Sequence, residues 1–254
     1  MDLLRSLRNG AAAGAVAGLL TGAFGYLLAE PAIDRSVQLE TAREAADQAR
    51  QVASGLTVEH HAEVFSRGTQ HLGLVVAAVA TGIALGVLFG VLHALLHRDR
   101  SDHNPWRSSL WLAASAFFAV YLVPFVRYPA TPPGVGDPNT IDTRTRAYLA
   151  ALAVGILGVV AAARLARDVR GRLSEPLRHL AVTGILLATI GLTFVLPANT
   201  DPLDVPAGLL WEFRLLAFAS SVLLWGALGA TYGLLSGSGT GSPAHSSDAS
   251  SLTV

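Results

Sequence analysis

Six long apolar stretches constrain this chain more than any other feature of its sequence. As an α-helix, each is long enough to cross the roughly 30 Å hydrocarbon core of a bilayer, which takes about 20 residues. Inside a bilayer every backbone polar group needs a partner within the protein, and a helix supplies those partners along its own length. We therefore expect an all-α polytopic membrane protein with about six transmembrane helices. The stretches are residues 10–29, 72–96, 108–126, 147–163, 180–196 and 215–235.

The residue types that are missing exclude several kinds of chemistry. All 18 basic residues are arginine, so the chain has no lysine for a Walker A phosphate-binding loop or for a Schiff base. Cysteine is absent and Met1 is the single methionine, which removes the sulfur ligands that Cu⁺ prefers. The formal net charge of zero gives no support for a nucleic-acid partner. The sequence shows no catalytic triad, no paired acid and base carboxylates and no HExxH motif, so we do not expect an enzyme or a permanently bound cofactor.

The distribution of arginine predicts which side of the membrane each connection occupies. Positively charged residues are retained in the cytoplasmic connections of a membrane protein. Ten arginines lie before the first stretch, between the second and third, or between the fourth and fifth, and eight lie on the other side. We therefore expect both termini in the cytoplasm. The first stretch is too long for a typical signal peptide, and we expect it to remain as a transmembrane helix.

The predicted domain organisation is one transmembrane bundle, residues 1–235, followed by a disordered cytoplasmic tail, residues 236–254, which is rich in Ser and Gly. The first outer segment, residues 30–70, favours helix and carries opposite charges near i,i+4 spacing, such as Arg43 with Asp47. A solvated helix that lies over the outer mouth of the bundle would account for this pattern, and so would a plain linker hairpin.

Glycines repeat at four-residue spacing in the first two stretches. Small residues at regular spacing let transmembrane helices approach closely. We therefore predict tight helix contacts, either within one bundle or between the protomers of a homo-oligomer. The residues are Gly10, Gly14, Gly18 and Gly22 in the first stretch, and Gly82, Gly86 and Gly90 in the second.

A proline followed by alanine recurs where the three outgoing stretches end. Proline commonly follows helices, so the recurrence is either a coincidence or a sign of three helical hairpins descended from one unit. The three places are Glu30-Pro31-Ala32, Tyr128-Pro129-Ala130 and Leu196-Pro197-Ala198.

Histidines gather in the first outer segment and form the candidate metal site: His60, His61 and Glu63, with His71 at the start of the second stretch. Imidazole and carboxylate ligands suit borderline divalent ions such as Co²⁺, Ni²⁺ and Zn²⁺. The alternative is a hydrated polar cluster in an exposed loop.

A second pair of histidines, His93 and His97, lies four residues apart near the inner end of the second stretch. Histidines are common at helix C-termini because a positive imidazolium suits the helix dipole, and we interpret the pair as such.

Ionisable residues at the edges of the stretches form the candidate substrate path. Charged groups in or near a bilayer are costly, which makes them functional candidates by default. We predict an outer vestibule in which acids face arginines, and mutual pairing without a role in transport is the alternative. The acids are Glu30, Asp137 and Glu212, and the arginines are Arg67, Arg144 and Arg214.

The outer loop of residues 127–146 carries four prolines, which stiffen the backbone, and two glycines, Gly134 and Gly136, which permit turns that other residues cannot make. This loop and several flanking motifs resemble the CbtA family of probable cobalt transporter membrane subunits. The motifs are Glu30-Pro31, Ser66-Arg67-Gly68 with Gln70, Tyr128-Pro129-Ala130-x-Pro132-Pro133, Val135-Gly136-Asp137-Pro138, Thr140-Ile141 to Arg144-Thr145, and Trp211 with Phe213-Arg214-Leu215.

The resemblance implies a subunit of the bacterial cytoplasmic membrane that takes up Co²⁺ to supply corrinoid synthesis. It also implies a small one-helix partner, CbtB, whose tail bears histidines. Three functions stay open at this point: a metal permease whose ion passes between the glycine-packed helices, a non-conducting membrane protein that assembles with the small partner, and a transporter of an anionic or corrinoid species. The outer arginines motivate the third.

Overall fold

The computed structural model describes residues 3–54, 67–98, 104–133, 135–203 and 205–237. All regular secondary structure in these ranges is helical. The elements are α1 (Leu3–Phe24), η1 (Gly25–Ala29), α2 (Glu30–Ala53), α3 (Arg67–His97), α4 (Pro105–Ala116), η2 (Phe117–Leu122), α5 (Val123–Arg127), η3 (Pro138–Thr140), α6 (Ile141–Asp168), α7 (Glu175–Thr193) and α8 (Ala207–Gly237).

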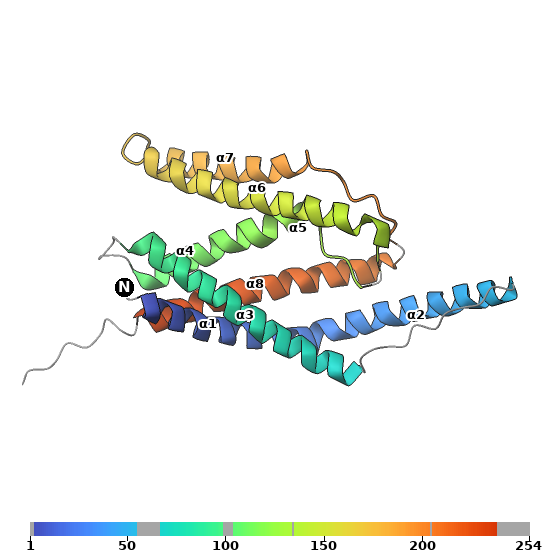
Figure 1. Ribbon diagram of the computed structural model, residues 1–254. Helices are drawn as coiled ribbons and strands as arrows, with labels where there is room; N and C mark the ends of the chain where they lie inside the picture. Colours follow the sequence, from blue (N-terminus) through green and yellow to red (C-terminus); the bar gives the residue numbers. More distant parts are fainter. Residues whose placement is uncertain (1–2, 55–66, 99–103, 134, 204, 238–254) are drawn as a thin grey trace, which may run out of the picture.

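Six helical segments among the described residues are long and apolar enough to span a membrane, which confirms the predicted fold class. They run alternately in opposite directions, so α1 begins and α8 ends at the same end of the bundle (Figure 1). We call this the termini end. The opposite end, where the proline-rich loop lies, is called the loop end. Many large apolar side chains, such as Leu88, Leu157 and Leu187, are exposed, as expected for helices that face lipid.

The glycine repeats bring α1 and α3 into backbone contact. A Cβ atom at Gly10 would overlap the carbonyl oxygen of Gly86, and one at Gly82 would overlap that of Gly14. Only glycine therefore permits this approach, which confirms the predicted tight contact and places it within one chain. The interface leaves no space for an ion, so the expected passage between the glycine-packed helices is wrong for this pair.

The rest of the bundle is arranged around α8 and the segment from α4 to α5. Helix α8 packs on α1 and α4, and the core between them contains Phe89, Trp225 and Tyr232. The π-helical turn η2 and α5 continue α4 and pack on α6, while α7 lies on α6. The described parts of α7 and α8 are not packed against each other along their lengths, in contrast to α1 and α3. Three equivalent hairpins are therefore not what the structure shows.

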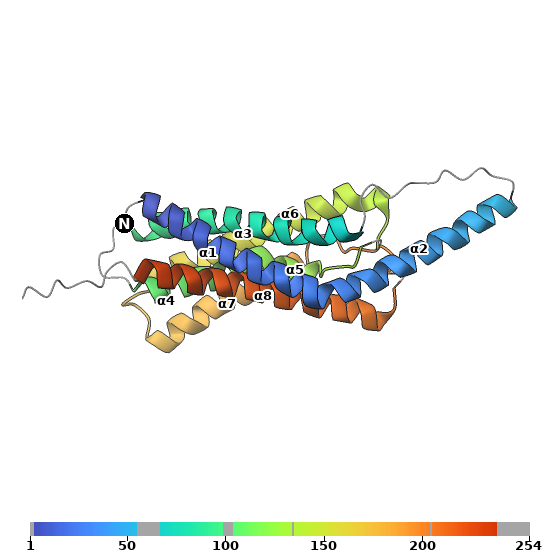
Figure 2. The same ribbon diagram turned by 90° about the horizontal axis from the view of Figure 1, so that it is seen from below.

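Helix α2 continues α1 through the π-helical turn η1, so one helical segment runs for 51 residues, Leu3–Ala53. At 1.5 Å per residue it is about 77 Å long, far more than a bilayer core requires. Figures 1 and 2 show α2 projecting beyond the loop end of the other helices. The expectation of a helix lying over the outer mouth is thus wrong for the described part of the segment, because no break turns the chain after α1.

Candidate functional site

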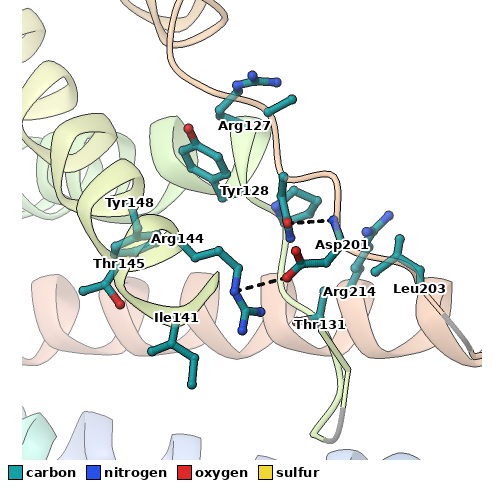
Figure 3. Close-up of a pocket in the computed structure, with 13 residues that line it drawn as sticks. Arg127, Tyr128, Thr131, Ile141, Arg144, Thr145, Tyr148, Asp201, Leu203 and Arg214 are labelled. Carbon is teal, nitrogen blue, oxygen red and sulfur yellow. Dashed lines mark hydrogen bonds and ion pairs between the residues drawn. The ribbon is translucent and has the colours of Figure 1, made fainter. Parts of the chain in front are cut away.

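A cavity of about 470 Å³ opens at the loop end between α5, α6, α8 and the connection from α7 to α8 (Figure 3). The proline-rich loop forms one wall, since proline ends α5 and the chain must cross to α6. The described lining residues are Arg127, Tyr128, Pro129, Thr131, Ile141, Arg144, Thr145, Tyr148, Ala198, Asn199, Asp201, Leu203 and Arg214.

An ion pair between Arg144 and Asp201 joins α6 to the connection between α7 and α8. Arg144 Nε lies 3.3 Å from Asp201 Oδ2, and the Asp201 side chain is only 5% exposed. The same carboxylate oxygen accepts hydrogen bonds from the Thr140 hydroxyl, at 2.8 Å, and from the Asp137 backbone N–H, at 3.3 Å. Arg144 also donates through Nη2 to the Asp137 carbonyl oxygen, at 3.2 Å. Asp201 therefore holds the start of α6 against the connection between α7 and α8.

Gly136 allows this arrangement through its backbone conformation. Its φ is +109°, a value that residues with a side chain rarely adopt, and a Cβ there would crowd the Arg144 guanidinium. The predicted need for glycine in this loop is thus met at Gly136, while Gly134 lies outside the described residues.

The other two arginines of the cavity bind backbone carbonyl groups. Arg127 donates through Nη2 to Leu196 O, and its guanidinium carbon lies 5.5 Å from the ring centres of Tyr128 and Phe194. Arg214 donates through Nε to Ala130 O, at 3.4 Å. These carbonyl partners leave both positive charges without a paired carboxylate among the described lining residues.

The structure brings together some of the predicted path residues and separates others. Arg144 and Arg214 line the cavity, and Asp137 contacts Arg144 through its carbonyl oxygen, not through its carboxylate. Glu212 pairs instead with Arg35 of α2, with Oε1 and Nη2 2.6 Å apart and both side chains about half exposed. Arg67 is the first residue of α3.

Glu30 lies away from the cavity, at the junction of η1 and α2. It is only 7% exposed, although it lies at the edge of the apolar part of the bundle. Its backbone N–H bonds to Gly25 O across the π-helical turn. Such turns occur frequently at functional sites, which draws attention to this carboxylate.

Three of the four candidate metal ligands, His60, His61 and Glu63, lie outside the described residues. His71 is the fifth residue of α3, and only its backbone is described. The described residues contain no group of three or more His, Asp or Glu side chains that could hold a metal ion. The proposed metal site therefore stays a prediction.

His93 differs from the surface residue that its position near a helix end suggested. It is fully buried, its Nε2 lies 2.9 Å from the Ser108 hydroxyl, and its ring is 4.9 Å from the ring of Tyr232. The next histidine, His97, stacks on it with ring centres 4.4 Å apart. Helix periodicity alone could not reveal this, because α4 and α8 cover His93 only in the folded bundle.

Asp201, Arg127 and Tyr128 line the cavity, and the sequence argument did not select them as path residues. The only available signal for Asp201 was its place in a polar connection, Asn199-Thr200-Asp201, between two apolar stretches. Its partner cannot be inferred from spacing, because Arg144 is far away in the chain.

Comparison with known protein families decides the membership of this chain. A family model described as a probable cobalt transporter subunit (CbtA) matches residues 4–237. The chain belongs to the CbtA family. The match includes all six membrane-spanning segments, so CbtA membership describes the whole bundle and not one motif. No match was found among curated proteins or among solved structures. The family is described as a transporter subunit.

Proposed function

We propose that this CbtA protein is the membrane subunit of a cobalt uptake system in the bacterial cytoplasmic membrane, with both termini in the cytoplasm. The observation that carries the proposal is the family match across residues 4–237, which covers the six membrane-spanning segments found among the described residues. The arginine bias supports the orientation, because it places the termini end inside and the loop end outside.

The proposed ion route avoids the α1–α3 interface and involves the buried ionisable residues Glu30 and His93. It is costly to bury an ionisable side chain in a membrane protein, so such residues usually have a function. The helix that begins at Glu30 packs on α8, and His93 contacts Tyr232 of α8 near the opposite end. A carboxylate and an imidazole are suitable ligands for Co²⁺. The two groups would act at successive positions of the route, each with further ligands from the backbone or from a partner.

The proposed partner is a small CbtB-like subunit with one transmembrane helix. The family description of a subunit supports an assembly. Helix α7 also exposes Leu180, Leu187 and Leu192, an apolar surface that either lipid or a partner helix can cover.

Accumulation of radioactive cobalt tests the proposal in cells that lack their own cobalt uptake. We expect accumulation when the chain is produced with the small partner, and a loss of at least about tenfold in Glu30→Gln and in His93→Phe, since each change removes a ligand. Glu40→Gln, at a less buried position of α2, is the matched control and should accumulate cobalt like the unchanged chain.

The same assay distinguishes cobalt uptake from a non-conducting assembly role. A chain that assembles with the small partner but gives no accumulation in any combination would be a non-conducting assembly protein. Accumulation that is unchanged in both variants would refute the route while leaving cobalt uptake in place.

A further inference from the structure

The loop-end cavity has an electrostatic character that does not suit a bare metal cation. Three described lining residues, Arg127, Arg144 and Arg214, are positive and one, Asp201, is negative, which leaves a formal charge of +2. Asp201 is already paired with Arg144 and is almost fully buried. The uncompensated charge therefore belongs to Arg127 and Arg214, and it repels Co²⁺ from this cavity.

The guanidinium of Arg127 has hydrogen-bonding capacity that the protein does not use. Its Nη2 donates to Leu196 O, but its Nε is buried and has no hydrogen-bond partner. A buried N–H group without an acceptor is costly, and two parallel N–H groups of an arginine match the two oxygens of a carboxylate or phosphate. The positive charge of Arg127 therefore favours an oxyanion in the cavity that this residue lines.

The remaining lining residues suit a small polar molecule. Thr131, Thr145 and Asn199 offer polar side chains, and Tyr128 and Tyr148 add aromatic surface. Figure 3 draws Tyr128, Thr131, Thr145 and Tyr148 among the residues that line the cavity, with Arg127 and Arg214 contributed by different elements. A volume of about 470 Å³ is within the range of small-molecule sites.

We propose that the loop-end cavity binds an oxyanion, a carboxylate or phosphate group, through Arg127 and Arg214. Its source is a soluble organic anion or an anionic lipid headgroup, because both present the same chemistry. The connecting loops that contribute Thr131 and Asn199 line the cavity, which favours the soluble anion. The proposal does not depend on cobalt uptake, and it assigns to this cavity a ligand other than the bare ion.

Titration of the full-length protein in neutral detergent tests the proposal with citrate and with inorganic phosphate. Nanodiscs that contain phosphatidylglycerol, compared with phosphatidylcholine alone, provide the lipid probe. We expect saturable binding of at least one probe, and the probe that binds identifies the source. Arg127→Gln and Arg214→Gln should each weaken it at least about tenfold, the effect of losing one charge-assisted contact.

Two further variants keep the test decisive. Arg146→Gln is the matched control, since Arg146 is an exposed arginine of α6 that does not line the cavity and should bind like the unchanged protein. Asn199→Asp keeps the side-chain oxygen that accepts from the Asp201 N–H but adds a negative charge to the lining, and it should weaken binding even if the arginine variants fail to fold. Absence of binding by all three probes, or equal binding by the Arg127, Arg214 and Arg146 variants, would overturn the anion site without affecting the cobalt accumulation result.

Discussion

At the scale of single residues, the loop end depends on Asp201 more than on the acids that the sequence argument selected. Its buried carboxylate pairs with Arg144 and accepts hydrogen bonds from the Thr140 hydroxyl and the Asp137 N–H. These partners belong to α6 and to the loop that precedes it, so Asp201 ties that part of the chain to the connection between α7 and α8. Glu212, by contrast, holds an exposed pair with Arg35. The two carboxylates therefore differ in how much of the fold they stabilise.

We predict that Asp201→Ala lowers the free energy of unfolding by about 1–3 kcal/mol, because it leaves the partly buried donors of Arg144 and Thr140 and the Asp137 N–H without their acceptor. Glu212→Gln is the comparison and should cost about 1 kcal/mol or less, since surface ion pairs contribute little. Thermal or denaturant unfolding in detergent, followed by a spectroscopic signal, measures both. Equal losses in the two variants would contradict the assigned role of Asp201.

At the scale of helices, the glycine-packed pair of α1 and α3 is the most constrained part of the bundle. The two backbones are in contact at Gly10, Gly14, Gly82 and Gly86, so a methyl group at any of these positions meets a carbonyl oxygen. Transmembrane helices gain stability from such close packing, because lipid provides no hydrophobic drive for their association. This pair serves as a rigid support for α8, which packs on α1.

We predict that Gly86→Ala destabilises the protein by roughly 1–3 kcal/mol, the usual cost of an overpacked interior. Gly184→Ala in α7 is the matched control, since no atom lies within 4 Å of the added Cβ. It should be neutral or slightly stabilising, because alanine has a higher helix propensity than glycine. The measurement is the temperature at which the purified protein loses its monodisperse peak in detergent. If Gly184→Ala lowered this temperature as much as Gly86→Ala, the contact between α1 and α3 would not explain the loss of stability.

At the scale of the whole molecule, the start of α1 and the end of α8 lie at one end of the bundle and the charged cavity lies at the other. Because the number of membrane-spanning segments is even, the first one begins on the side of the membrane where the last one ends. The direction relative to the cell is predicted from the arginine bias, because positively charged residues are retained in cytoplasmic connections.

Labelling of single cysteines tests the direction, and the natural absence of cysteine makes the background clean. We predict that Asn139→Cys at the loop end reacts with a membrane-impermeant maleimide in intact cells. Arg172→Cys, in the connection between α6 and α7, should react only after the membrane is permeabilised. Both positions are exposed, so the difference measures location and not burial. The reverse result would invert the topology, and labelling of both in intact cells would contradict the crossing of the membrane by α6, the one span between the two positions.

Local patterns in the sequence were sufficient for the existence of the helices, for close packing at the glycine repeats of the first two apolar stretches, and for the family, while the structure showed that these two helices pack on each other within one chain. Length, hydropathy and glycine spacing are all visible within one helix. The spacing of Gly86 and its neighbouring glycines therefore predicts close helix packing without information about distant residues. The same patterns could not predict which side chains contact each other across the bundle. Asp201 and Arg144, Glu212 and Arg35, and His93 beneath α8 are all brought together by the order in which the helices pack.

What the sequence by itself determined is therefore a six-helix membrane bundle with a polar, proline-rich connection at one end, because the bilayer admits few structures for apolar stretches of this length. Only the tertiary structure decided that α2 continues α1 past the bundle, that the α1–α3 interface is closed to ions, and that Arg127 and Arg214 share a positively charged cavity. These outcomes depend on distances between residues far apart in the chain, which are set by how side chains fill the space between helices.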